Sequence, residues 1–76
     1  MYKKNPLYPN VEAEIVRAQL TKRELAKELG IAERTLYNKL SGKTELSISE
    51  ARMICTIIER RTGRPQSLKN LFNIMI

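Results

Sequence analysis

With 76 residues, the chain is long enough for one domain with a modest core and too short for a fused sensing or large dimerisation module. Fourteen Lys and Arg residues against eight acidic ones give a formal net charge of +6, as expected for a protein whose partner is a polyanion. Histidine is absent, and no cluster has the spacing of metal ligands or of a nucleophile with its base. We therefore expect a single domain over residues 1–76 that is not an enzyme and uses no metal, cofactor or small-molecule ligand.

Cys55 is the single cysteine, so an intramolecular disulfide is excluded, which suits a reducing cytoplasm. It lies in the apolar run 53–58, where a small buried hydrophobic side chain is the expected role. No apolar stretch approaches the length needed to span a bilayer, and no signal-peptide pattern opens the chain. The sequence predicts a cytoplasmic protein without membrane contact.

The chain begins with an extended basic arm, residues 1–9, that contains two prolines and two lysines. Lys3 and Lys4 either lie against DNA or belong to a solvated terminus, which is the commoner case. Asn10 is a good N-cap for a first helix, and acidic residues follow in its first turns, where the helix dipole favours anions. The apolar residues expected on the inward face of this helix are Val11, Ile15, Val16 and Leu20.

Residues 21–41 predict two short helices joined by a sharp turn. Thr21 and Glu24 have the spacing of a capping box, in which each side chain bonds the backbone N–H of the other residue. Gly30 follows the first apolar stripe, where the left-handed residue that ends a helix is most easily a glycine. Ala26 lies where the two helices would touch, so a larger side chain would hold them apart. The residues expected to face inward are Leu25, Ala26, Leu29, Ile31, Thr35, Leu36 and Leu40.

A longer helix is expected to begin after Ser47 and to run to about Arg61. Ser47 and Glu50 form a second capping box, and Gly63 with Pro65 ends the helix. The residues expected on its inward face are Ile48, Ala51, Ile54, Ile57 and Ile58.

Residues 63–76 are expected to form a C-terminal helix and tail. Ser67 is the predicted cap of a short helix over 68–75, and its apolar residues Leu71 and Phe72 lead into Ile76 at the terminus. A tail this apolar either completes the core of the monomer or presents a patch to a second copy of the chain.

The second helix of the 21–41 unit carries hydrogen-bonding side chains on its outward face, and such a unit reads DNA. The segment resembles the helix-turn-helix of the lambdoid phage repressors and Cro proteins, the group often called XRE-like. With flanking helices, the resemblance covers about residues 10–62. The residues that fit the family pattern without a gap are Thr21, Glu24, Leu25, Ala26, Leu29, Gly30, Ile31, Thr35, Leu36, Gly42 and Lys43.

Three features depart from that pattern. Lys22 replaces a glutamine that bonds a phosphate, and a lysine retains that ability as a point charge. Ala32 replaces the usual Ser or Thr, so the second helix lacks its N-cap oxygen at a cost of roughly 1 kcal/mol. Lys39 stands at the usual apolar position and Leu40 at the usual acidic one, which leaves the helix intact and rotates its end.

The resemblance implies an all-α fold, a compact four- to five-helix bundle of the lambda repressor-like DNA-binding domain type. It also implies a sequence-specific transcription regulator of the phage or prophage repressor or Cro type, which binds double-stranded DNA as a homodimer. Carried over from the family motif, the base-reading residues are Ala32, Glu33, Arg34 and Asn38, with Tyr37 beside them. The residues expected to contact phosphates at both ends of the reading helix are Thr21, Lys22, Arg23, Lys39, Ser41, Lys43 and Thr44.

Alternatives stay open for single residues and for the whole chain. Tyr37 either reads DNA or packs at the helix edge, and Glu33 either accepts from cytosine or orients Arg34. The same fold also serves an antitoxin-like or adaptor protein that binds a partner protein through its C-terminal helices. A further alternative is an interaction module that has lost DNA binding. The long polar side chains of the second helix favour a DNA-binding function.

Overall fold

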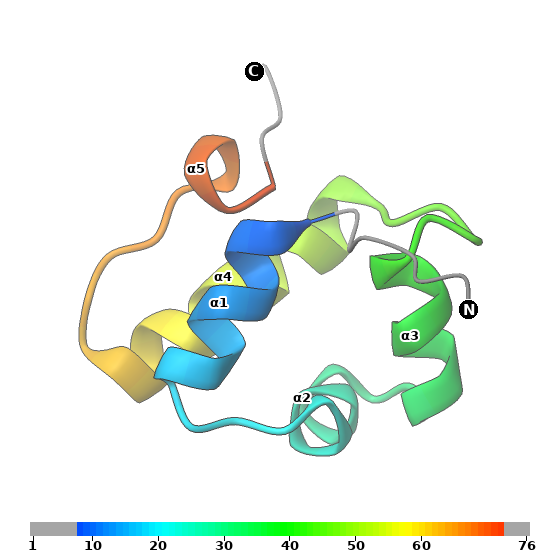
Figure 1. The fold of residues 1–76 in the computed structure, drawn as a ribbon, viewed down its shortest axis with the longest axis horizontal. Helices are drawn as coiled ribbons and strands as arrows, with labels where there is room; N and C mark the ends of the chain where they lie inside the picture. Colours follow the sequence, from blue (N-terminus) through cyan, green and yellow to red (C-terminus); the bar gives the residue numbers. More distant parts are fainter. Residues whose placement is uncertain (1–7, 73–76) are drawn as a thin grey trace, which may run out of the picture.

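The computed structural model describes residues 8–72, which form an all-helical globule without a strand in that range. The five helices are α1 (Pro9–Arg17), α2 (Lys22–Leu29), α3 (Glu33–Leu40), α4 (Ile48–Thr62) and α5 (Leu68–Phe72) (Figure 1). The sequence therefore predicted the number and order of the helices and the all-α class correctly. None of these helices is long and apolar enough to cross a membrane.

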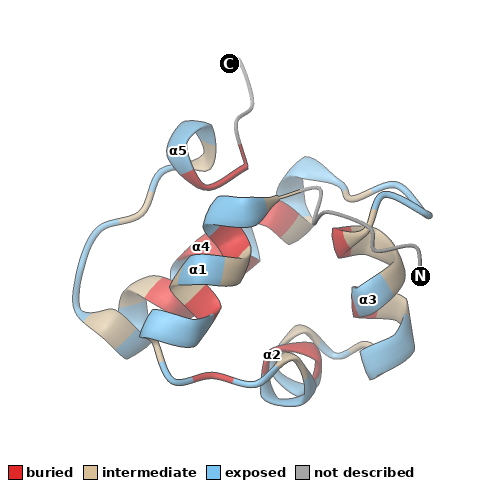
Figure 2. Ribbon diagram, in the orientation of Figure 1, coloured by how far each residue is buried: buried red, intermediate tan, exposed pale blue. Residues whose placement is uncertain are grey.

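The hydrophobic core is built around α4, the longest helix. The helices α1 and α5 pack against α4 and against each other, and α2 joins α3 to α4 (Figure 1). Figure 2 shows buried positions along α4 and on the inward sides of the other helices. The buried residues are Val11, Ile15, Leu20, Leu25, Ala26, Leu36, Leu40, Ala51, Ile54, Cys55, Ile57, Ile58, Leu71 and Phe72.

Both predicted capping boxes are confirmed. Thr21 Oγ1 accepts from the Glu24 N–H at 3.0 Å, and Glu24 Oε1 accepts from the Thr21 N–H at 2.9 Å. Ser47 and Glu50 form the same reciprocal pair at 3.1 and 2.9 Å. These backbone hydrogen bonds favour the ionised carboxylates, so they lower the pKa of Glu24 and of Glu50.

Helix α1 differs from the prediction at its start. Asn10 is not the N-cap, because Tyr8 occupies that position and Pro9 is the first helical residue. A proline there loses no helical hydrogen bond and already has the φ angle that a helix requires. The Asn10 side chain instead donates from Nδ2 to the Asn70 carbonyl at 2.6 Å, which ties α1 to α5.

A second error concerns Val16 at the end of α1. It was expected to face inward but is 75% exposed, because it lies about 100° around the helix from the buried Ile15. Gln19 adopts a left-handed conformation with a φ of 58°. The Leu20 and Gln19 N–H groups donate to the Ile15 and Val16 carbonyls at 3.0 and 2.9 Å. This Schellman motif turns Leu20 into the core, where it substitutes for the apolar residue that another helical turn would have supplied.

The start of α4 also departs from the prediction. Ile48 was expected to face inward but is 48% exposed at the first position of the helix. The core contact there comes from Leu46, which is half-buried and precedes the capping residue Ser47. The other end agrees closely, since α4 ends at Thr62 and Gly63 follows in a left-handed conformation.

The described part of the C-terminal segment completes the core of the monomer. Leu71 and Phe72 are buried, and the Ser67 hydroxyl accepts from the Asn70 N–H at 3.1 Å, as the predicted cap requires. The Tyr8 ring packs edge-on against Phe72 at 5.1 Å between ring centroids. Of the predicted extended arm 1–9, residues 1–7 with Lys3 and Lys4 lie outside the described residues, and Pro9 belongs to α1. The apolar residues 74–76 also lie outside the described residues.

Candidate nucleic-acid interface

The helices α2 and α3 meet at the turn that the sequence predicted. Gly30 has a φ of 76°, and the Gly30 and Ile31 N–H groups donate to the Lys27 and Ala26 carbonyls at 3.1 and 3.0 Å. Ala26 is 2% exposed, in keeping with a site that tolerates only a small side chain. In Figure 1, α2 is seen end-on while α3 lies in the plane of the picture, so the two helices cross steeply.

The burial of α3 defines its free face. Leu36 and Leu40, four residues apart, are fully buried on the same side of the helix. Glu33, Arg34 and Tyr37 are exposed, and of these Arg34 lies on the side opposite the two leucines. Thr35 was predicted to face inward and is half-buried, at the boundary between the two faces.

Arg34 and Asn38 lie one helical turn apart, which places their side chains next to each other along α3. Arg34 is exposed and forms no ion pair with another described residue. Asn38 is half-buried, and its backbone carbonyl accepts from the Lys43 and Thr44 N–H groups at 2.9 and 3.2 Å. Those bonds engage only its backbone, so the carboxamide is left for other partners.

The start of α3 carries the two remaining base-reading candidates. Ala32 is exposed at the N-cap position and provides no side-chain cap, as its sequence predicted. Glu33 follows in the first turn and is also exposed. The methyl group and the carboxylate therefore stand at the same end of the helix as Arg34.

Lys22 connects three helices. Its ammonium lies 2.7 Å from Glu12 Oε1 on α1 and 4.8 Å from the centroid of the Tyr37 ring on α3. Tyr37 is 49% exposed, so one part of its ring supports the lysine while the rest is free. The sequence did not reveal the role of Glu12, because this contact joins residues on separate helices. The contact also places the N-terminus of α2 beside the exposed face of α3.

Lys39, a predicted phosphate contact, is paired within the protein. Its ammonium donates to the Glu45 carbonyl at 3.1 Å and to the Glu50 carboxylate at 3.2 Å, and its side chain is only 16% exposed. The side chain lies beside Leu36 and Leu46, at the position where the family pattern has an apolar residue. In the structure Lys39 therefore anchors the loop after α3, and its phosphate role stays a prediction.

The other phosphate candidates form two groups. Thr21 and Arg23 are exposed at the start of α2, where backbone N–H groups and the helix dipole favour an anion. Lys43 and Thr44 are exposed beyond the end of α3, with the half-buried Ser41 just before them. Neither Arg23 nor Lys43 forms an ion pair within residues 8–72.

The resulting surface has a neutral and basic centre with few free carboxylates. Glu24 caps its own helix, and Glu28 lies 3.7 Å from Arg61, so both are engaged. Among the described residues, no group of three or more His, Cys, Asp or Glu side chains could hold a metal ion. No protein-family model, curated protein sequence or solved structure matches the chain.

Proposed function

We propose that this chain is a sequence-specific DNA-binding transcription regulator that inserts α3 into the major groove of duplex DNA. The observation that carries the proposal is the pairing of Arg34 and Asn38 on the exposed side of a helix set steeply across α2. An α-helix with its side chains is about 10–12 Å across. The major groove, about 12 Å wide, therefore accommodates such a helix.

The candidate side chains of α3, and Ala32 just before it, each fit a base-edge contact. The Arg34 guanidinium matches the O6 and N7 acceptors of guanine, and the Asn38 carboxamide matches N6 and N7 of adenine. The Ala32 methyl suits the methyl group of thymine, and the Glu33 carboxylate accepts from cytosine N4 or orients Arg34. Tyr37 lies beside these residues and would add a contact to the DNA, while the Lys22 ammonium packs on one face of its ring.

Phosphate contacts on both sides of α3 would set its register. The first backbone N–H groups of α2 and the Arg23 side chain would bind one phosphate. Lys43 and Thr44, with Ser41, would bind another beyond the end of α3. In this arrangement Lys22 acts mainly through its contacts with Glu12 and Tyr37, which hold α1, α2 and α3 together.

A single reading helix covers only half of a typical operator. Two copies on an inverted repeat gain affinity because the second contact is nearly intramolecular. A homodimer on DNA, acting by occlusion of a promoter, therefore completes the proposal. The resemblance to the lambdoid repressors and Cro proteins favours a repressor of phage or prophage type.

Selection of preferred sites from random duplex DNA tests the proposal directly. We expect inverted repeats whose half-site centres lie roughly 10 to 11 base pairs apart, bound by two chains per duplex. A chain with both Arg34→Ala and Asn38→Ala should yield no such motif, whereas Lys27→Ala, an exposed change on α2, should yield the parent motif. If the parent chain enriches no motif, or only single half-sites bound by monomers, the proposed function is wrong.

A further inference from the structure

A second surface with basic residues lies away from α3, where two of them, Arg52 and Lys69, line one groove. Residues 52–69 contain five basic side chains and one carboxylate, a net charge of +4, which exceeds the +3 of residues 21–44. In Figure 1, α5 and the C-terminal end of α4 lie on the left and α3 on the right. Of the five basic residues, only Arg61 forms an ion pair within the described part of the chain, with Glu28 at 3.7 Å. If DNA binds through α3, the basic residues of this second surface do not contact it.

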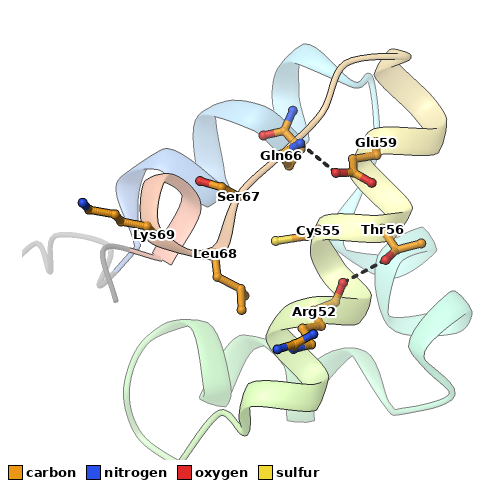
Figure 3. Close-up of a pocket in the computed structure, with 8 residues that line it drawn as sticks. All are labelled: Arg52, Cys55, Thr56, Glu59, Gln66, Ser67, Leu68 and Lys69. Carbon is orange, nitrogen blue, oxygen red and sulfur yellow. Dashed lines mark hydrogen bonds between the residues drawn. The ribbon is translucent and has the colours of Figure 1, made fainter. Parts of the chain in front are cut away.

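An open groove of about 480 Å³ crosses this surface, between α4 and the segment that leads into α5 (Figure 3). Cys55 and Leu68 provide apolar surface within it, Arg52 stands on the α4 side, and Lys69 stands on the α5 side with its ammonium turned outward. Burial and the neighbouring Glu59 carboxylate raise the pKa of the Cys55 thiol, so it stays protonated and serves as an apolar group. The groove thus combines apolar and basic surface.

The walls of the groove are held in place by the fold. The Gln66 N–H donates to Glu59 Oε2 at 2.8 Å, which fixes the connecting segment on α4 and engages the one carboxylate among the described residues that line the groove (Figure 3). The Ser67 hydroxyl caps the first turn of α5, and Phe72 anchors that helix in the core. A ligand would therefore meet a preformed surface and would not have to order it.

We propose that this groove binds a short segment of a partner protein in which acidic residues flank an apolar side chain. The apolar side chain would cover Leu68 and Cys55, and the flanking carboxylates would pair with Arg52 and Lys69. The volume is sufficient for a few side chains and far too small for a folded domain. This site goes beyond the DNA-binding function and is independent of it.

The chemistry of the groove favours this occupant over three others. A small molecule would remain largely exposed in so open a groove, whereas small-ligand sites enclose most of their ligand. A second copy docked symmetrically would bring Arg52 and Lys69 close to the same basic residues of its partner. A DNA backbone would satisfy the positive charge but offers no apolar group for Leu68.

The test begins with a displayed library of random 12-residue peptides, selected on the full-length chain and depleted on a chain carrying both Arg52→Glu and Lys69→Glu. We expect enrichment of sequences in which Asp or Glu flanks Leu, Ile, Phe or Met. A synthetic peptide of the enriched sequence should shift the backbone amide resonances of Cys55, Leu68 and Lys69 and leave those of α3 unchanged.

Affinity measurements with the same peptide distinguish a contact with the charges of the groove from attraction by the net charge of the protein. The double charge reversal at Arg52 and Lys69 should weaken binding about tenfold or more. The matched reversals Lys27→Glu and Arg60→Glu, both at exposed positions outside the groove, should change it about twofold or less at physiological salt. Thermal melting of both variants establishes that each remains folded.

Four results would overturn the proposal. In the first, the library shows no enrichment of acidic and apolar residues, and in the second, the peptide shifts only resonances of α3. In the third, both double variants lose the same affinity for the peptide. In the fourth, the resonances of the groove respond to random duplex DNA but not to the peptide. The last result would make the surface a second nucleic-acid contact. Failure of the DNA site selection would leave all four measurements unaffected, so the two proposals fail separately.

Discussion

Arg34 is the residue whose replacement best separates base reading from phosphate binding. It is exposed in the first turn of α3 and has no carboxylate partner among residues 8–72. Arg34→Ala should lose roughly 1–3 kcal/mol on the preferred site and relax the base preference in each half-site, because a two-pronged guanine contact is lost. Binding titrations on preferred and scrambled duplexes measure both effects. Equal weakening on the two duplexes would make Arg34 a phosphate ligand instead.

Gln19 carries backbone strain that a glycine would relieve. Its φ of 58° lies in the left-handed region, which disfavours a residue with a side chain by roughly 1–2 kcal/mol. The added flexibility of glycine in the unfolded chain offsets part of that gain. Gln19→Gly should therefore raise the free energy of unfolding by about 0.5–1 kcal/mol, as measured by urea denaturation.

The control for Gln19→Gly is Ala13→Gly, which places glycine at an exposed position in the middle of α1 and should destabilise the protein. Loss of stability in Gln19→Gly would mean that the left-handed turn before Leu20 is absent in solution. The turn at Gln19 could not be predicted from the sequence, because no glycine or asparagine stands at the left-handed position.

At the scale of the helices, the steep packing of α2 on α3 depends on Ala26 and Gly30. Ala26→Leu should lower the free energy of unfolding by about 1–3 kcal/mol, since the buried methyl has no space to grow. A Cβ at Gly30 would meet no atom within 4 Å, so the cost there comes from the positive φ and not from a clash. Gly30→Val should therefore be more harmful than Gly30→Asn, because asparagine tolerates a left-handed backbone.

Denaturation of the three variants beside the parent measures these costs. If Ala26→Leu and Gly30→Val were both as stable as the parent, the close packing of α2 on α3 would be refuted. If Gly30→Asn proved as harmful as Gly30→Val, side-chain volume would matter at this turn, contrary to the open space around it.

The two capping boxes should make stability depend on acid pH. Backbone hydrogen bonds lower the pKa of Glu24 and Glu50 in the folded chain, so each contributes stability above its unfolded pKa and loses it as pH falls through the lower folded value. Stability should thus decline below about pH 5, near the carboxylate pKa of an unfolded chain. Denaturation between pH 7 and 2 should show a smaller decline in a chain with both Glu24→Gln and Glu50→Gln.

Glu33→Gln is the control for that experiment, because Glu33 makes no hydrogen bond to another described residue and should leave the acid decline unchanged. An unaltered decline in the double glutamine variant would show that other carboxylates dominate acid unfolding.

Elements governed by neighbouring residues were predictable from the sequence. The two capping boxes and the Gly30 turn depend on residues within a few positions of each other, so their spacing is visible in the chain. The contacts of Lys22 with Glu12 and of Lys39 with Glu50 depend on how separate helices pack. The spacing of residues in the sequence does not give those distances, so the partners of Lys22 and Lys39 could not be predicted. The DNA-reading role of α3 and the other candidate contacts stays a prediction.

At the scale of the whole molecule, positive charge is divided between the α2–α3 surface and the groove beside α5. If only the first surface meets DNA, Lys43→Ala should weaken binding to preferred and random duplexes by similar factors. It should also flatten the dependence of log K on log salt by about one unit for each subunit, because one fewer counterion is displaced. The variant with both Arg52→Glu and Lys69→Glu should keep the parent slope within about half a unit, despite its larger change in net charge. Titrations at four or more salt concentrations compare these slopes. The salt dependence could instead flatten more in the variant with Arg52→Glu and Lys69→Glu than in Lys43→Ala. That result would place the duplex on α4 and α5, and α3 would then not be the reading helix.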